Sequence, residues 1–175
     1  MKHLKGIRDI YSQIGVQNYY QFNKADYHNP HTEFIHTSLD WVKDQIEIGS
    51  FLDLSCGDGV VSSYLKDGGF TNFFGTDPYF CDIYSKKLGT ECFQLSFEEI
   101  AKSGLPKSVD TIISSYALHL CPHSFLNTLL YQLAKNCKYL VIISPNKNPE
   151  VKNYFEEVSA AKFGKSNCRI LKSLL

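Results

Sequence analysis

Five short apolar segments alternate with helical ones along the chain, and this alternation constrains the fold more than any other feature. The expected strands are 51–55, 72–76, 91–95, 109–115 and 139–144. Their apolar residues run almost without interruption, which is typical of strands buried on both faces of a sheet. Helical segments are predicted between them, over 60–66, 80–88, 97–103 and 125–136. This order predicts an α/β fold with a doubly wound, mostly parallel sheet.

The segments on either side of this core are expected to complete a single domain of 175 residues. Amphipathic helices are predicted over 7–22 and 31–46, so residues 1–47 are expected to form a helical lid before the core at 48–146. In the last part, 147–175, we expect a helix over 149–163 and a final strand over 168–174. That ending is short for this architecture.

The composition argues against several classes of protein. The 18 basic and 18 acidic residues balance, so there is no strong nucleic-acid signal and no polybasic membrane anchor. No apolar run approaches the ~20 residues that a membrane span needs. The first fifteen residues contain no apolar segment typical of a secretory signal. The six cysteines include no C-x-x-C pair, so we expect reduced thiols and a cytoplasmic or nuclear protein.

The loop after the first expected strand has the composition of a ligand-binding turn. Gly57 and Gly59, at alternate positions, allow a sharp turn and a close approach of ligand to backbone. The next helix points its free N–H groups at that ligand. Ser62 stands where the dinucleotide pattern G-x-G-x-x-G needs Gly or Ala. Asp53 would repel a pyrophosphate but suits an ammonium group, so the loop favours S-adenosylmethionine over a dinucleotide.

An acidic residue also ends the second expected strand. Asp77 stands where an acidic side chain in dinucleotide folds accepts hydrogen bonds from both ribose hydroxyls of an adenosine. The carboxyl ends of parallel strands meet at one edge of a sheet, where ligands bind. Asp77 and the glycine loop are therefore expected to border one site.

Three segments resemble successive motifs of the Rossmann-like (class I) S-adenosylmethionine-dependent methyltransferases. They are Asp53-Leu-Ser-Cys-Gly-Asp-Gly59, Gly75-Thr-Asp-Pro78 and Val109-Asp-Thr-Ile-Ile-Ser-Ser-Tyr-Ala-Leu-His119. The resemblance covers about residues 48–146. It implies a seven-stranded sheet ending in an antiparallel hairpin, S-adenosylmethionine as cofactor, and methyl transfer to an acceptor that the sequence does not identify. Balanced charge favours a small molecule or a protein side chain as acceptor, and a partner subunit stays open.

The resemblance also implies cofactor-binding residues at four strand ends. The first end would hold the methionine moiety, the second the ribose, the third the adenine, and the fourth would lie beneath the sulfonium. In chain order these residues are Asp53, Ser55, Gly57 and Gly59, then Asp77 and Pro78, then Ser96 and Phe97, and finally Ser115 and Tyr116.

Two positions depart from the family's usual pattern. Glycine usually stands where Ser55 is, and aspartate often stands where Ser96 is. The C-terminal hairpin is also expected to be shortened. These departures motivate an alternative hypothesis, a non-catalytic methyltransferase-like domain that serves as a binding partner or scaffold. A nicotinamide dehydrogenase is a weaker alternative, because the third glycine of its motif is replaced by Ser62.

Histidine and tyrosine residues carry the remaining predictions. His119 follows the fourth strand, where an imidazole can act as general base because its unperturbed pKa of about 6.5 permits proton removal near neutrality. The alternative is that His119 packs at a helix start. Tyr20, Tyr27 and His31 lie in a segment that family members use as a lid, so the resemblance implies a flap over cofactor and acceptor. The histidine spacing fits no standard zinc set, so no metal site is predicted.

Overall fold

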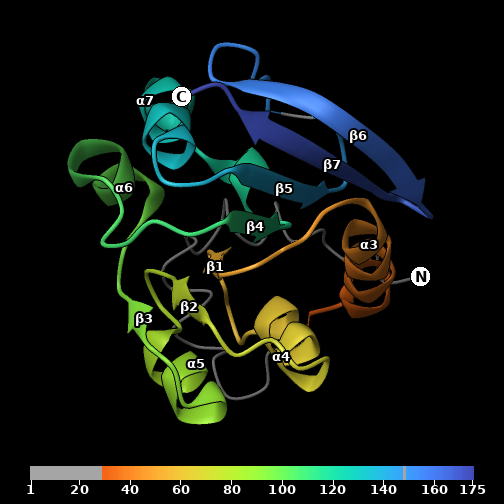
Figure 1. Ribbon diagram of the computed structural model, residues 1–175. Coiled ribbons are helices and arrows are strands. Elements are labelled where there is room, and N and C mark those ends of the chain that lie inside the picture. The colour runs from red at the N-terminus through yellow and green to blue at the C-terminus, as the bar shows by residue number, and fades with distance from the viewer. Residues whose placement is uncertain (1–28, 148) are drawn as a thin grey trace, which may run out of the picture.

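The computed structural model of the chain describes residues 29–147 and 149–175. Its centre is a seven-stranded sheet in the order β3-β2-β1-β4-β5-β7-β6 (Figure 1). The first five strands are parallel, and β7 runs antiparallel to both β5 and β6. The strands are β1 (Phe51–Leu54), β2 (Phe73–Thr76), β3 (Cys92–Phe93), β4 (Thr111–Ser115), β5 (Tyr139–Ser144), β6 (Phe155–Phe163) and β7 (Ser166–Ser173). The predicted α/β, mostly parallel sheet is confirmed.

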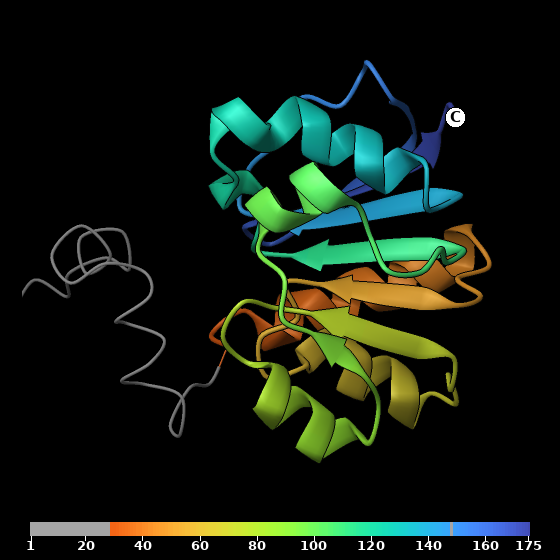
Figure 2. The ribbon, with the colours of Figure 1, turned by 90° about the vertical axis from the view of Figure 1, so that its left-hand side faces the viewer.

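Helices cover both faces of this sheet (Figures 1 and 2). One face carries α3 (Thr32–Gln45), α4 (Val60–Asp67) and α5 (Cys81–Leu88), and the other carries α6 (Phe97–Ser103) and α7 (His123–Ala134). A short 3₁₀ turn, η1 (Leu118–Leu120), precedes α7. None of the helices in the described part of the chain is long and apolar enough to cross a membrane.

Alternate side chains along the strands pack into two separate hydrophobic cores, one on each face of the sheet. Phe51, Ile113 and Val141 pack against α3, α4 and α5. Their neighbours Leu52 and Ile112 pack with the apolar side chains of α6 and α7. Since successive strand side chains point to opposite faces, strands between two helical layers must be apolar at nearly every position. The uninterrupted apolar runs in the sequence follow directly from this arrangement.

The strand order reverses at the centre of the sheet. β1 pairs with β2 on one side and with β4 on the other, all parallel. The connections that leave the carboxyl ends of β1 and β4 therefore diverge to opposite faces, which in open α/β sheets opens a crevice for a ligand. The glycine loop follows β1 and lies at this point.

The predicted C-terminal helix over 149–163 is wrong, because most of this segment forms the edge strand β6. Its residues Glu156–Lys162 include good helix formers, and most of them are exposed. A register shift between Glu157 and Ser159 also breaks the alternation that a half-buried strand would show. Pairing with β7 overrides the local preference. The antiparallel strands β7 and β6 fit the expected C-terminal hairpin, and the described residues between β5 and β6 contain no helix.

Only part of the predicted N-terminal helical segment lies within the described residues. The predicted helix over 31–46 is confirmed as α3, whose Ile35, Leu39 and Val42 are buried against the sheet. The other predicted helix, over 7–22, lies outside the described residues, as do Tyr20 and Tyr27. Helix α3 covers one face of the sheet, and its first turn reaches the carboxyl edge.

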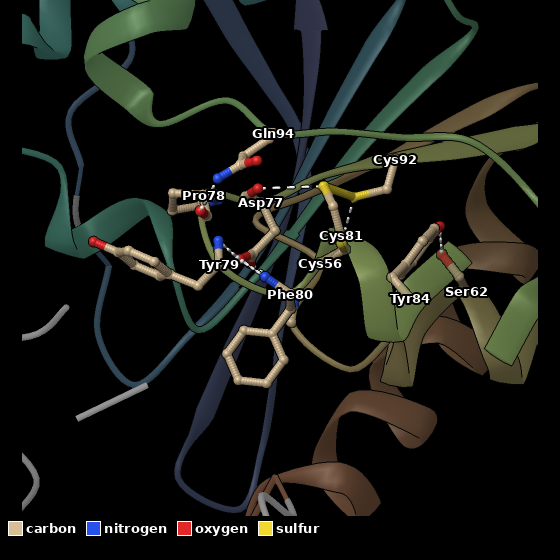
Figure 3. The surroundings of a disulfide bond; sticks show 11 residues. Cys56, Ser62, Asp77, Pro78, Tyr79, Phe80, Cys81, Tyr84, Cys92 and Gln94 are labelled. Carbon is tan, nitrogen blue, oxygen red and sulfur yellow. Dashed lines mark hydrogen bonds between the residues drawn. A yellow bond between two sulfur atoms is a disulfide. The ribbon is translucent and has the colours of Figure 1, made fainter. Parts of the chain in front are cut away.

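One pair of cysteines corrects the expectation of reduced thiols. Cys81, the first residue of α5, is disulfide-bonded to Cys92, the first residue of β3 (Figure 3). The Sγ of Cys56 lies 3.7 Å from the Sγ of Cys92. The other cysteines, Cys121, Cys137 and Cys168, are free and buried, as is Cys56. The pairing was missed because it depends on α5 folding back along β3, which spacing does not reveal.

Reducing this disulfide should lower the free energy of unfolding by roughly 2–3 kcal/mol. The bond closes a loop with a sequence separation of 11, and such cross-links restrict the unfolded chain to about this extent. Urea denaturation with and without a phosphine reductant would measure the difference. A Cys92→Ser variant is the control and should not respond to the reductant. Equal midpoints for the natural chain in both conditions would contradict the prediction.

Candidate cofactor site

The glycine loop is a tight turn in which alternate residues have left-handed backbones. Ser55, Gly57 and Gly59 have φ values of 57°, 53° and 84°. A Cβ atom added to Gly57 would meet nothing within 4 Å, so this residue borders open space. A Cβ on Gly59 would come within 2.8 Å of Leu88 Cδ1 and 3.1 Å of a Tyr84 ring carbon. Gly59 therefore allows the loop to pack on α5, whereas Gly57 leaves room for a ligand.

Ser55 occupies a conformation that favours glycine. An L-residue in the left-handed region costs about 1–2 kcal/mol, which a glycine at this position would avoid. Glycine would in turn cost roughly 0.5–1 kcal/mol in backbone entropy. We therefore expect Ser55→Gly to raise the free energy of unfolding by up to about 1 kcal/mol. Thermal and urea denaturation would measure this change. A clearly less stable variant would mean that the Ser55 side chain makes a compensating contact.

Asp77 connects the glycine loop to the start of α5. Its buried carboxylate accepts a hydrogen bond at Oδ2 from the backbone N–H of Gly57 (3.0 Å). Oδ1 accepts from the N–H groups of Tyr79 (2.8 Å) and Phe80 (2.9 Å) (Figure 3). The structure thus brings Asp77 and the glycine loop together, as the strand-end argument predicts. It also gives Asp77 a structural role that the sequence did not reveal.

Asp53 lies beneath the loop, with 1% of its surface exposed. Its Oδ2 accepts hydrogen bonds from the backbone N–H (3.2 Å) and the hydroxyl (2.7 Å) of Ser62 on α4. Among the described residues, its Oδ1 has no hydrogen-bond partner. Burial is the main cause that raises the pKa of Asp53 to about 7, against the opposing effect of the two Ser62 hydrogen bonds. In the sequence, Ser62 is recognisable only as a departure from the dinucleotide pattern, so its contact with Asp53 was not predicted.

The end of β4 meets the start of α3. The ring of Tyr116 stacks on His31, with centroids 3.9 Å apart and planes at 3°. Tyr116 has a left-handed backbone (φ 52°), and its phenol hydrogen-bonds to the hydroxyl of Ser166 at the start of β7. Desolvation lowers the pKa of His31. The structure therefore joins a residue predicted for the lid to one predicted for the cofactor site, and adds Ser166, which had no sequence signal.

The two predicted site residues after β3 lie at the start of α6, where they have structural roles. Ser96 is its N-cap: the Ser96 hydroxyl accepts from the Glu99 N–H (3.2 Å), and the Glu99 carboxylate accepts from the Ser96 N–H (2.8 Å). Phe97 packs against the core on the α6 and α7 face. His119 is half-buried in η1. In the part of the chain that the structure describes, no group of side chains is arranged to hold a metal ion.

No protein-family model matches the chain. An uncharacterized protein of Schizosaccharomyces pombe is 29% identical to it, over 83% of this chain and 77% of that protein. Among solved structures, magnesium protoporphyrin IX methyltransferase (ChlM) of Synechocystis PCC 6803, with bound S-adenosylmethionine, superposes with a TM-score of 0.65 and 16% identity, over 95% of this chain and 94% of ChlM. The chain has the Rossmann-like methyltransferase fold.

A second solved structure supports the same fold. The N-methyltransferase NodS of Bradyrhizobium japonicum WM9, in complex with S-adenosylhomocysteine, superposes with a TM-score of 0.66 and 12% identity, over 84% of this chain and 89% of NodS. Two features at the carboxyl edge suit a ligand that carries a positively charged group. Open space lies over Gly57, and the buried Oδ1 of Asp53 lacks a partner among the described residues.

Proposed function

We propose that this chain is a methyltransferase that uses S-adenosylmethionine. The observation that carries the proposal is the hydrogen bond between the Gly57 N–H and the Asp77 carboxylate at the carboxyl edge of a methyltransferase fold. It joins an open glycine loop to the acidic strand end that suits a ribose. ChlM and NodS were crystallised with S-adenosylmethionine and S-adenosylhomocysteine, respectively, which supports the choice of cofactor.

The cofactor would lie along the carboxyl ends of β1, β2, β3 and β4. The backbone of the glycine loop and the first turn of α4 would hold the methionine moiety. Residues at the ends of the next strands would hold the ribose and the adenine. These contacts are assigned to Asp53, Ser55, Gly57 and Gly59 for the methionine end, Asp77 and Pro78 for the ribose, Ser96 and Phe97 for the adenine, and Ser115 and Tyr116 beneath the sulfonium.

When bound, the cofactor supplies an electrophilic methyl group: the bond from sulfur to the methyl carbon breaks as the acceptor nucleophile bonds to that carbon. The chain contributes chiefly orientation, which can account for much of the acceleration in such displacements. The stacked rings of His31 and Tyr116 form one wall of the acceptor side. His119 is proposed as the general base that accepts the acceptor's proton. The stretch 116–121 contains no lysine or arginine, so no cation there opposes the sulfonium.

The acceptor is proposed to be a small molecule or a protein side chain. Nucleic-acid binding draws most of its affinity from Lys and Arg at the phosphates. The balance of 18 basic and 18 acidic residues supplies no excess of positive charge for that purpose. Methyl transfer from labelled cofactor into extract fractionated by size would identify the class of acceptor, with label in long nucleic acid contradicting this part of the proposal.

Calorimetric titration of the full chain with S-adenosylmethionine, S-adenosylhomocysteine and NAD tests the cofactor assignment. We expect saturable binding of the first two and none of NAD. Absence of binding at millimolar S-adenosylmethionine and S-adenosylhomocysteine would overturn the proposal and favour a non-catalytic domain. Binding of NAD alone would instead favour a dehydrogenase.

A further inference from the structure

A chain of three buried polar side chains runs from α5 to β1 behind the glycine loop. The hydroxyl oxygen of Tyr84 lies 2.6 Å from Ser62 Oγ, and Ser62 Oγ lies 2.7 Å from Asp53 Oδ2. Tyr84 and Ser62 are fully buried, and Asp53 is almost so. Figure 3 shows the Tyr84 hydroxyl directed at Ser62. The side chains of Tyr84 and Ser62 are not among the proposed cofactor contacts.

The number of available protons fixes which group donates in each hydrogen bond of the Tyr84–Ser62–Asp53 row. An ionised carboxylate can only accept hydrogen bonds, so the single hydroxyl proton of Ser62 is donated to Asp53. The Tyr84 hydroxyl must then donate to Ser62 Oγ. Hydrogen bonds in such a row polarise one another, so a donor at the far end strengthens the bond at the near end. Tyr84 therefore acts on Asp53 although it does not touch it.

The surroundings of Asp53 otherwise oppose its negative charge. Burial raises the pKa of this carboxyl most, and the nearby carboxylates of Asp77 and Asp58 raise it further. The Cys56 thiol and the Tyr84 phenol are both neutral, because burial, and next the charge of Asp53, raise the pKa of each. The hydrogen bonds from Ser62 are the influences that favour the charged form.

We propose that Tyr84 is a positioning residue of the cofactor site, which through Ser62 keeps Asp53 ionised for the ammonium group at the methionine end of the cofactor. Two observations support this role. Oδ2 carries both Ser62 hydrogen bonds, whereas Oδ1 has no partner among the described residues. Asp53 also directly precedes the loop that borders open space at Gly57. The inference rests on the proposed function, because it assumes a cationic ligand.

The proposal makes cofactor affinity depend on pH. A cation beside Asp53 favours its ionised form, so the pKa of Asp53 falls when the ligand binds. By linkage, affinity is greatest above the pKa of the ligand-free protein, about 7, and decreases as pH falls through that value. Removing the Tyr84 hydroxyl weakens the bond that favours the charge, so the decrease should begin at a higher pH.

Calorimetric titration of the full chain with S-adenosylhomocysteine between pH 5.5 and 8.5 tests this inference with Tyr84→Phe. We expect the midpoint of the pH dependence to rise by about half to one pH unit, as the loss of one hydrogen bond implies. At pH 6 the variant should bind about 3- to 10-fold more weakly than the natural chain, and at pH 8.5 nearly equally. The ligand's own titration is common to both proteins and cancels.

Tyr64→Phe is the matched control. Tyr64 lies on α4 and donates to Asp40 at the surface, so the same change there should leave the pH profile unaltered. A uniform loss of affinity for Tyr84→Phe at every pH would mark a merely structural role and overturn the inference. If Tyr84→Phe does not fold, Ser62→Ala takes its place, since it removes the hydroxyl and keeps the backbone N–H donor.

A titration of the Asp53 carboxyl by NMR in the ligand-free protein separates this inference from the proposed function. If S-adenosylhomocysteine does not bind the natural chain, the proposed function fails and the assumed cationic ligand fails with it. A raised Asp53 pKa in Tyr84→Phe would then still establish the relay itself, that is, the effect of Tyr84 on Asp53 through Ser62. If the ligand binds but neither the Asp53 pKa nor the pH profile moves, the relay is wrong while the function stands.

Discussion

Replacing Gly57 by alanine should weaken the binding of S-adenosylhomocysteine by about 100-fold while the chain remains folded. A methyl group at this position would enter the open space above the loop, where nothing lies within 4 Å. Forcing an extra methyl into an occupied site typically costs about 1–3 kcal/mol, and tenfold in affinity corresponds to about 1.4 kcal/mol. Calorimetry at pH 8.5, where Asp53 is largely ionised, would measure the loss.

Gly89→Ala is the matched control for this variant. Gly89 has a similar left-handed backbone (φ 67°), and a Cβ there also meets nothing within 4 Å, but the residue is the C-cap of α5 and is not among the proposed cofactor contacts. Both variants should lose up to about 1 kcal/mol of stability, because the cost of the left-handed backbone is partly offset by the smaller entropy of the unfolded chain. Only Gly57→Ala should lose affinity. Normal binding by Gly57→Ala would show that the ligand does not lie over this loop.

Replacing Asp77 by alanine should lower the free energy of unfolding by at least about 3 kcal/mol and also reduce cofactor affinity. The change removes the acceptor of three backbone N–H groups, those of Gly57, Tyr79 and Phe80. Each donor left unsatisfied in a buried position costs about 1–3 kcal/mol. The ribose hydroxyls would lose their proposed acceptor as well. Urea denaturation and calorimetry with S-adenosylhomocysteine would measure the two effects.

Asp110→Ala separates the two effects of the Asp77 variant. The Asp110 carboxylate accepts from the backbone N–H (2.8 Å) and the hydroxyl (2.6 Å) of Ser50, just before β1 and therefore at the opposite edge of the sheet. These bonds lower the pKa of Asp110. Asp110→Ala should cost stability without changing affinity. An Asp77→Ala protein as stable as the natural chain would contradict the proposed anchoring.

Helix α5 supports the candidate site in three ways. Its N-cap residue Phe80 donates to Asp77, its first residue Cys81 is bonded to Cys92 on β3, and Tyr84 one turn later reaches Ser62. Gly75 on β2 makes this close packing possible, because a Cβ there would lie 2.8 Å from the Tyr84 ring and 2.9 Å from Cys56 Sγ. Changes in α5 should therefore affect the cofactor site without touching the ligand.

The amino-acid sequence by itself determined the layered α/β fold, the parallel strands and the position of the glycine loop. These features are local, since burial on both faces makes each strand continuously apolar and a tight turn requires glycine at particular positions. The strand-end argument also brought Asp77 to the loop, because the carboxyl ends of parallel strands share one edge.

Only the tertiary structure decided which residues from different elements meet. Segment 155–163 is a strand because it pairs with β7, and this pairing outweighs the helical preference of its residues. The Cys81–Cys92 bond and the stack of His31 on Tyr116 depend on how α5 and α3 pack against the sheet. The Tyr84–Ser62–Asp53 chain likewise joins three elements. Such contacts carry no local periodicity, so they arise only once the strand order and the helix positions have been set.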